Sequence, residues 1–371
     1  MLQIEKIVIR HLTMPLVSTF RISTGTTKTR KIMLIEIHSN DLIGYGECPA
    51  GEHPYYSLET VQIEFMIIRD YFIKKILGKK FETPHQFRSF LEFVRGHKTA
   101  KSALEYAFWD LYGKSVGRPL FELYGGTKKR IEVGVSIGIQ TSTKDLIEKI
   151  EHYLNQGYKR IKIKITPGWD INILKEIRET YPKIMLMADA NGAYTLNDLK
   201  ILMQLDTFNL LMIEQPLHYE DLVDHAALQT YLKTPICLDE SIKSIHSAKI
   251  AIKLKSCKII NIKPPRVGGI IESIKIHDLS VENNIGLWIG GMLETGIGKT
   301  HLLHIASLPG INYPSDISDY TRYWKEDIID KPLKLDKDST IPIPQDKGLG
   351  VHPDPDLIEK YQNKVWTYKA T

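Results

Sequence analysis

The sequence predicts an α/β fold in which a (β/α)8 barrel carries an α+β capping domain formed by the N-terminal region and the C-terminal tail. From about residue 130, apolar β-branched segments alternate with segments of helical periodicity, which is typical of βα units around a parallel sheet. Eight such strands in about 190 residues match the count of a closed barrel. We therefore expect a capping domain at 1–126, the barrel at 127–320 and a tail at 321–371 that returns to the capping domain.

The N-terminal region has the pattern of antiparallel strands followed by helices. Segments 4–14 and 31–39 are β-branched and partly alternating, which predicts two strands. Between them, 15–30 is rich in Ser, Thr and Gly and is predicted to be a mobile loop, and 44–57 is predicted to be a second loop. Two segments with helical periodicity follow, at 58–78 and about 85–117.

Eight segments are the candidate barrel strands. They are IEVGVSIGI (131–139), RIKIKI (160–165), IMLMADAN (184–191), LLMIEQP (210–216), ICLDES (236–241), KIINIKP (258–264), GLWIGG (286–291) and the weaker INYPSDIS (311–318). A doubly wound sheet is the alternative, but no GxGxxG motif follows a strand, so its usual nucleotide-binding signature is missing.

Five consecutive strands end in an ionisable residue. These residues are Lys164, Asp189, Glu214, Asp239 and Lys263, with spacings of 25, 25, 25 and 24 residues, close to one βα unit each. In barrels the carboxyl ends of the strands carry the active site. A single charged strand end could be a core residue whose hydrogen bonds are satisfied within the protein. Five charged residues at the same height in the barrel instead need a metal or another partner to compensate the cost of burying them.

Three neighbouring strands supply the carboxylates of Asp189, Glu214 and Asp239. An all-oxygen set of ligands suits a hard divalent cation, so we expect Mg²⁺, with Mn²⁺ or Co²⁺ as substitutes. Zinc is disfavoured because no His or Cys accompanies the acids, and the 13 histidines form no HxH or HExxH motif.

The two lysines flank the three acids, on the second and sixth strands, and therefore lie on opposite walls of the barrel. A metal with a base on each face suits the removal of a proton from a carbon next to a carboxylate. A lysine can act as a base only if its pKa falls by about 2–3 units from its ordinary value. Lys162 and Lys164 share one face of their strand, so each raises the cost of charging the other.

Together these residues resemble the enolase superfamily, specifically its muconate lactonizing enzyme subgroup, over nearly the whole chain. The resemblance implies that the three acids bind Mg²⁺, that Lys164 and Lys263 form the acid–base pair and that Lys162 tunes their charge. It places Asn191 and Glu240 beside the metal ligands. It also implies six substrate contacts, the last two on capping loops: Ser136, Gly291, Met292, Leu293, Phe20 and Tyr55.

Within the subgroup, GGMLETGIG (290–298) and NIKPPRVGG (261–269) are similar to the o-succinylbenzoate synthases that are related to N-succinylamino acid racemases. The resemblance implies dehydration of 2-succinyl-6-hydroxy-2,4-cyclohexadiene-1-carboxylate in menaquinone biosynthesis, through an enediolate, with N-acylamino acid racemase activity beside it or as the main role. Arg266 favours the racemase-related branch, whereas Pro265 replaces an expected Gly, which puts the local loop geometry in question.

Several alternatives are weighed against this interpretation. Muconate cycloisomerase shares the lysines and acids, and a catalytically inactive binding protein of the same fold is the non-enzymatic alternative. A dipeptide epimerase would carry Asp-x-Asp where this chain has Asp316-Ile317-Ser318, and a Schiff-base aldolase would leave the acids without a role. GIGKT (296–300) is not a phosphate loop, because its first glycine would fall on Leu293.

The charge distribution and the composition of the chain limit its possible binding partners and its cellular compartment. The 49 basic and 44 acidic residues are scattered and not interleaved with aromatic residues, so we expect no nucleic-acid partner. Three cysteines without a CxxC pair indicate a reducing cytoplasm. Charged residues close to the N-terminus argue against a signal peptide. The sequence contains no stretch of about 18 uncharged apolar residues, so we expect no membrane span. We expect a cytoplasmic homo-oligomer that binds a small carboxylate substrate.

Overall fold

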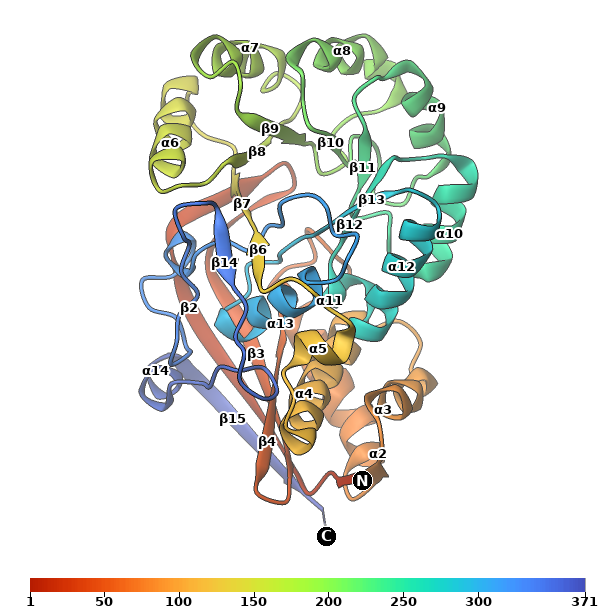
Figure 1. The fold of residues 1–371 in the computed structure, drawn as a ribbon, viewed down its shortest axis with the longest axis vertical. Coiled ribbons are helices and arrows are strands. Elements are labelled where there is room, and N and C mark those ends of the chain that lie inside the picture. The colour runs from red at the N-terminus through yellow and green to blue at the C-terminus, as the bar shows by residue number, and fades with distance from the viewer. Residues whose placement is uncertain (371) are drawn as a thin grey trace.

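The computed structural model describes residues 1–370, whose two large sheets lie in different halves of the molecule (Figure 1). Seven parallel strands with surrounding helices occupy the upper half of the view, and a four-stranded antiparallel sheet with its own helices occupies the lower half. This combination of a barrel with an α+β unit confirms the predicted fold class.

The antiparallel sheet has the strand order β15-β2-β3-β4. Strands β2 (Lys6–Ile22), β3 (Gly25–Ser39) and β4 (Leu42–Cys48) follow one another, while β15 (Gln362–Lys369) comes from the C-terminal tail and pairs with β2. The two ends of the chain therefore share one sheet. A separate two-stranded pair joins β1 (Leu2–Gln3) to β5 (Lys80–Phe81).

The predicted mobile loop at 15–30 is wrong. Strands β2 and β3 continue through this segment, with Phe20 opposite Thr27 and Ile22 opposite Gly25, and the ladder shifts register between Pro15 and Phe20. The composition suggested a loop, but threonine is β-branched and favours a strand. The predicted loop at 44–57 begins within β4 and is irregular only after Cys48.

The N-terminal region also contains helices. They are α1 (Val61–Ile67), the π-helical turn η1 (Ile68–Ile73), α2 (Lys74–Ile76), α3 (Pro84–Phe90), the 3-10 turn η2 (Leu91–Phe93), α4 (Lys98–Val116) and α5 (Leu120–Tyr124). Of these helices, α1 and α4 pack directly on the antiparallel sheet. Helix α4 lies so close to β4 that a Cβ atom at Gly44 would stand 2.0 Å from the carbonyl oxygen of Ala107. Only glycine allows this approach.

The parallel sheet runs in sequence order from β7 to β13. Its strands are β7 (Gly134–Ile137), β8 (Arg160–Lys164), β9 (Met185–Asp189), β10 (Ile213–Glu214), β11 (Ile236–Leu238), β12 (Ile259–Ile262) and β13 (Gly286–Ile289). Strand β6 (Arg130–Glu132) instead pairs with β14 (Thr340–Pro342) of the tail.

The predicted eighth strand at 311–318 is not a regular strand. It forms two isolated parallel bridges, from Ile311 to Leu287 on one side and from Ser315 to Val133 on the other. These bridges join both edges of the seven-stranded sheet and close the barrel. Pro314, which lacks an N–H donor, interrupts the ladder between them.

Helices surround the barrel strands (Figure 1). They are α6 (Thr143–Asn155), α7 (Ile171–Thr180), η3 (Leu196–Asp198), α8 (Leu199–Gln204), η4 (Leu205–Phe208), α9 (Val223–Tyr231), α10 (Ile245–Leu254), α11 (Pro264–Val267), α12 (Ile270–Glu282) and α13 (Gly296–Ala306). The tail adds η5 (Tyr320–Arg322) and α14 (Pro355–Tyr361).

A small apolar cluster fills the inside of the barrel. Met187, Met212 and Cys237 each precede an acidic strand-end residue by two positions, and the period of two places them on the same inward face. Trp288 belongs to the same apolar cluster, and the ammonium nitrogen of Lys162 lies 4.7 Å from the centre of the Trp288 ring. The charged layer therefore rests directly on an apolar base.

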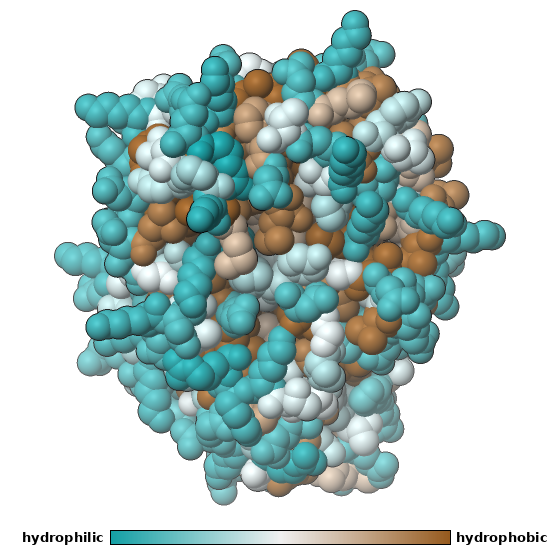
Figure 2. Space-filling view, turned by 45° about the horizontal axis from the view of Figure 1, so that its top comes forward, coloured by the Kyte–Doolittle hydropathy of each residue, from teal (hydrophilic) through white to brown (hydrophobic). Residues whose placement is uncertain are grey.

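The surface is mainly polar. Figure 2 shows hydrophilic side chains over most of one face, with hydrophobic side chains in small groups among them. Within residues 1–370, no helix is both long and apolar enough to span a membrane. The three cysteines are free and buried.

Candidate active site

The strand register brings the charged strand ends to one height. Lys164 lies opposite Asp189 in the β8–β9 pair, and Asp189 lies opposite Glu214 in the β9–β10 pair. Asp239 directly follows β11, and Lys263 directly follows β12. The equal spacing in the sequence thus becomes a layer of charges at the carboxyl ends of five adjacent strands.

Within this layer, each acid is paired with a cation. The ammonium of Lys164 lies 2.5 Å from Asp189 Oδ2, and that of Lys162 lies 2.9 Å from Glu214 Oε2. Lys263 lies 2.7 Å from Asp239 Oδ2. All of these side chains are buried, so their interactions are weakly screened by solvent.

Burial and crowding shift the acids in opposite directions. Burial, followed by the charges of Asp189 and Asp239, raises the pKa of Glu214 to about 8. Burial also acts to raise the pKa of Asp239, but Arg266 and Lys263 hold it well below its usual range. Three acids packed together therefore need compensating positive charge.

Two of the lysines, Lys162 and Lys263, have pKa values shifted opposite to the predicted direction. Burial alone would lower the pKa of Lys162, but Asp316 and Glu214 raise it well above the ordinary value. Asp239 has the same effect on the pKa of Lys263. The expected lowering of the lysine pKa is therefore wrong for these two side chains as they are arranged here, because each ammonium contacts a carboxylate directly.

The donor set fits a hard divalent cation in its chemistry. As the side chains of residues 1–370 are oriented, no three Asp, Glu, His or Cys groups are grouped for a metal, since the three acids turn toward lysines and Arg266. Three further oxygens nearby are buried without a hydrogen-bond partner: Asn191 Oδ1, Glu240 Oε2 and Asn261 Oδ1. The acceptors at this place are all oxygen atoms, and such a set matches Mg²⁺ better than zinc.

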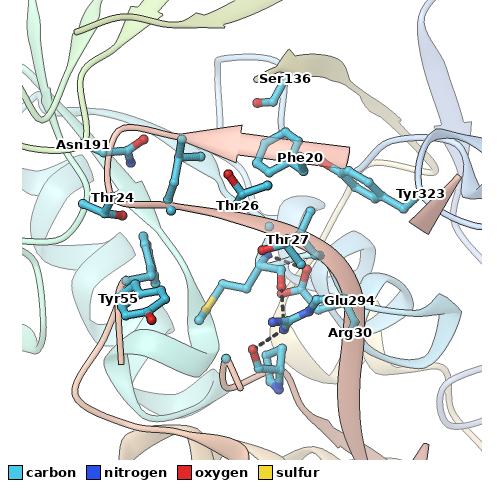
Figure 3. A pocket seen from close by; sticks show the side chains of 18 of the residues that line it. Phe20, Thr24, Thr26, Thr27, Arg30, Tyr55, Ser136, Asn191, Glu294 and Tyr323 are labelled. Carbon is cyan, nitrogen blue, oxygen red and sulfur yellow. Dashed lines mark hydrogen bonds between the residues drawn. The ribbon is translucent and has the colours of Figure 1, made fainter. Parts of the chain in front are cut away.

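A cavity of about 440 Å³ lies above the charged layer. The β2–β3 hairpin and the loop after β4 cover it, while the barrel forms its base (Figure 3). It is lined by these residues predicted from the sequence: Phe20, Tyr55, Ser136, Lys162, Lys164, Asn191, Lys263, Gly291, Met292 and Leu293. The three acids and Glu240 are not in its lining and lie below it, although Glu240 accepts a 2.8 Å hydrogen bond from Asn191.

Strained backbone marks the same end of the barrel. Asn191, Gln215 and Leu293 follow β9, β10 and β13 with φ values of 46°, 38° and 62°, a region unfavourable to residues with a Cβ. The side chain of Gln215 compensates by accepting a 3.0 Å hydrogen bond from the backbone N–H of Asp239. This contact fixes the backbone of one acid relative to the next strand.

Four polar residues of the site are not among those predicted from the sequence, although Arg266 and Asp316 stand in motifs discussed above. Asn261 donates to Glu214 over 2.7 Å, and Arg266 forms an ion pair with Asp239. Asp316 lies 2.6 Å from Lys162 and accepts a hydrogen bond from Ser136. The period of two could have identified Asn261, which shares the inward face of β12 with Lys263.

Tyr56 is the fourth missed residue, and no local pattern pointed to it. Its hydroxyl accepts a 2.8 Å hydrogen bond from Lys263 and lies 3.1 Å from Asp239 Oδ2. The sequence predicts its exposed neighbour Tyr55 as a substrate contact, and Tyr55 also lines the cavity. Only the packing of the loop after β4 against the barrel brings Tyr56 to Lys263.

The chain belongs to the enolase superfamily. This class of enzyme is defined by the closed barrel, the capping sheet and the layer of acids and lysines. Residues 4–125 match the mandelate racemase / muconate lactonizing enzyme N-terminal domain family, and residues 145–357 match the enolase C-terminal domain-like family. Enzymes of this family depend on a divalent metal ion.

Relatives that match over nearly their full length indicate which branch of the superfamily this chain is similar to. The chain is 45% identical to an o-succinylbenzoate synthase of Geobacillus kaustophilus, covering 97% of this chain and 96% of the relative. It is 44% identical to an N-succinylamino acid racemase of Thermus thermophilus, covering 95% of each. A crystal structure of an enolase superfamily member from Listeria innocua superposes with a TM-score of 0.96 at 36% identity, covering 100% of both chains.

Proposed function

We propose that this chain is an o-succinylbenzoate synthase, a carbon–oxygen lyase that dehydrates 2-succinyl-6-hydroxy-2,4-cyclohexadiene-1-carboxylate in cytoplasmic menaquinone biosynthesis. The observation that carries the proposal is the placement of Lys164 and Lys263, which reach one cavity from the second and sixth barrel strands above buried acids. The full-length similarity to a synthase of that name supports it.

The proposed reaction begins with proton removal at the ring carbon that bears the carboxylate. Lys164, in its neutral form, takes this proton as general base. The electron pair of the broken C–H bond is first held in the enediolate of the carboxylate. It then forms the new ring double bond as the neighbouring C–O bond breaks. The hydroxide that leaves takes the proton held by Lys164 and departs as water, so Lys164 returns to its neutral form and the ring becomes aromatic.

Other groups stabilise the negative charge that builds up on the substrate carboxylate. The ammonium of Lys263, on the opposite wall, supplies fixed positive charge near this enediolate. Mg²⁺, for which Asp189, Glu214 and Asp239 are the proposed ligands, would supply Lewis-acid stabilisation when bound. Lys162, beside Lys164, would keep a second positive charge close to the carboxylate.

Racemisation of N-succinylamino acids is the second candidate activity. It requires a base on each face of the α-carbon, with one lysine removing the proton and the other returning a proton to the opposite face. The same two lysines in one cavity favour it, and a relative named N-succinylamino acid racemase supports it.

A side-by-side assay tests the proposal. The purified protein is given the cyclohexadiene substrate, an N-succinylamino acid or cis,cis-muconate, each with Mg²⁺ or with a chelator. We expect Mg²⁺-dependent dehydration with the highest kcat/KM and racemisation as a second activity. Turnover of muconate alone would contradict the proposal. An absence of turnover and of α-proton exchange with every substrate would favour a catalytically inactive binding protein.

A further inference from the structure

A buried lysine outside the acid–base layer also lines the cavity. Lys299 lies on α13 and is only 2% exposed. Among residues 1–370, no carboxylate comes within 4.0 Å of its ammonium. It donates two long hydrogen bonds, of 3.2 Å to the carbonyl oxygen of Ser318 and 3.4 Å to that of Asp319. The ring centre of Tyr323 lies 5.0 Å away.

The acids near Lys299 are directed at other groups. Glu294 accepts a 2.6 Å hydrogen bond from the backbone N–H of Met292, and Asp327 accepts one of 2.8 Å from Gly296. Burial raises the pKa of both acids and lowers that of Lys299, while the charges of Asp327 and Glu294 act to raise the pKa of Lys299. Within residues 1–370, Lys299 therefore has acids in its surroundings but none within ion-pair distance of its ammonium.

Arg30 adds a second cation to the cavity wall. It is buried, forms no ion pair within the described residues and donates to the carbonyl oxygens of Pro49 and Met292. In Figure 3, Arg30 and Tyr323 lie on one side of the cavity and Asn191 lies on the other. Glu294 lies beside Arg30 in the same view, so this end of the cavity holds cations together with one buried acid, away from Asn191, which neighbours the proposed metal ligands.

A buried ammonium without a counter-ion is costly, and an anion that enters the cavity would offset that cost. Charge-assisted hydrogen bonds to a carboxylate are among the strongest polar contacts in proteins. One substrate carboxylate is assigned to the acid–base layer. A second carboxylate, at the far end of the same molecule, would meet Lys299.

We propose that Lys299 binds the terminal carboxylate of the succinyl group and so selects dicarboxylate substrates over neutral acyl analogues. This inference rests on the proposed function, because it assumes that the other carboxylate lies between Lys164 and Lys263. Lys299 is the lysine of the GIGKT segment (296–300), which is not a phosphate loop, and this inference gives it a function in substrate specificity.

The test compares two acyl groups of nearly equal shape on one amino acid. One is N-succinyl, and the other is N-succinamoyl, in which a terminal amide replaces the carboxylate. For Lys299→Met, we expect kcat/KM for the succinyl substrate to fall about 10- to 100-fold, mainly through KM. The value for the succinamoyl substrate should change by less than about threefold. Lys28→Met is the matched control, because Lys28 lines the same cavity but is exposed, and it should leave the ratio unchanged.

Binding and stability measurements separate this inference from the proposed function. Calorimetric titration with N-succinylglycine should show tight binding to the wild type and at least tenfold weaker binding to Lys299→Met, whether or not the protein turns over any substrate. The unfolding temperature of the variant should not fall, because a buried unpaired charge is removed. An equal loss for both acyl groups, or unchanged binding of N-succinylglycine, would overturn the inference even if the wild type is an active synthase.

Discussion

At the scale of single residues, Lys164 and Lys263 differ in their surroundings. Within residues 1–370, Asp189 is the one polar partner of the Lys164 ammonium, whereas the Lys263 ammonium contacts Asp239 and the hydroxyl of Tyr56. This asymmetry suits a dehydration in which one lysine moves the proton and the other remains a fixed cation.

Replacing either lysine tests its role as a base or cation. We expect Lys164→Ala and Lys263→Ala each to lower kcat by at least about 10²-fold with the fold intact, because general acid–base groups contribute about 10²–10⁴-fold. Steady-state rates and circular dichroism measure the two effects. A folded variant that keeps more than about a hundredth of the rate would contradict the assigned role.

Asp239→Asn tests the proposed metal site. The substitution removes a negative charge while keeping the shape of the side chain, so we expect weaker Mg²⁺ binding and a higher Mg²⁺ concentration for half-maximal activity. Titration of the metal-free protein with Mg²⁺ measures it. Unchanged metal dependence would remove Asp239 from the ligands.

Tyr56→Phe tests the link between the capping loop and Lys263. Losing the hydroxyl removes the hydrogen bonds that hold Lys263 and Asp239, so we expect kcat to fall about tenfold with a small change in KM. Tyr55→Phe is the control, since Tyr55 lines the same cavity and has no comparable hydrogen bond among the described residues. Equal effects of the two substitutions would argue against a positioning role for Tyr56.

At the scale of secondary-structure elements, β4 stabilises the start of α13. Buried Glu47, near the end of β4, accepts hydrogen bonds of 3.0 Å and 2.9 Å from the backbone N–H groups of Thr295 and Gly298. These donors have no partner within the helix, so the acid caps it. An element of the N-terminal sheet thereby fixes the helix that carries Lys299.

This cap predicts a pH dependence of stability. Burial raises the pKa of Glu47 from 4.5 to about 7. Glu47 therefore binds its proton more tightly in the folded state than in the unfolded chain. The stability that this proton binding contributes is lost as the pH rises from about 4.5 through about 7. We expect Glu47→Gln to lessen this loss by at most about 3 kcal/mol. Denaturant unfolding of both proteins at pH 5 and pH 8 measures it, and parallel pH profiles would contradict it.

At the scale of the whole molecule, the tail completes the capping sheet. Strand β15 covers the edge of β2, and the ring centre of Trp366 lies 4.3 Å from that of Phe65 on α1. We propose that residues 1–126 and 321–371 form one capping unit, which the β6–β14 pair joins to the barrel at 127–320.

Removing β15 tests that unit. A chain that ends at Tyr361 exposes the edge of β2 and loses the Trp366 contact, so we expect a lower unfolding temperature by about 5–10 °C and a tendency to aggregate. A chain that ends at Lys369 keeps β15 and is the control. Unchanged thermal unfolding would show that the tail is dispensable. Light scattering of the intact protein tests the homo-oligomer that we also propose.

The sequence was most informative where local rules operate. The length of a βα unit sets the spacing of Lys164, Asp189, Glu214, Asp239 and Lys263, so their shared height could be predicted without any tertiary contact. The β2–β3 hairpin was mistaken for a loop because Ser- and Thr-rich composition is ambiguous when the partner strand is not known.

The sequence by itself determined the barrel, the order of its charged strand ends and the chemistry that they support, because these follow from periodicity within each strand. Only the tertiary structure decided which distant groups meet there. Tyr56 reaches Lys263 across 207 positions, and Arg30 reaches the backbone of Met292 across 262. Such contacts depend on how the capping elements pack on the barrel, and no local pattern encodes that packing.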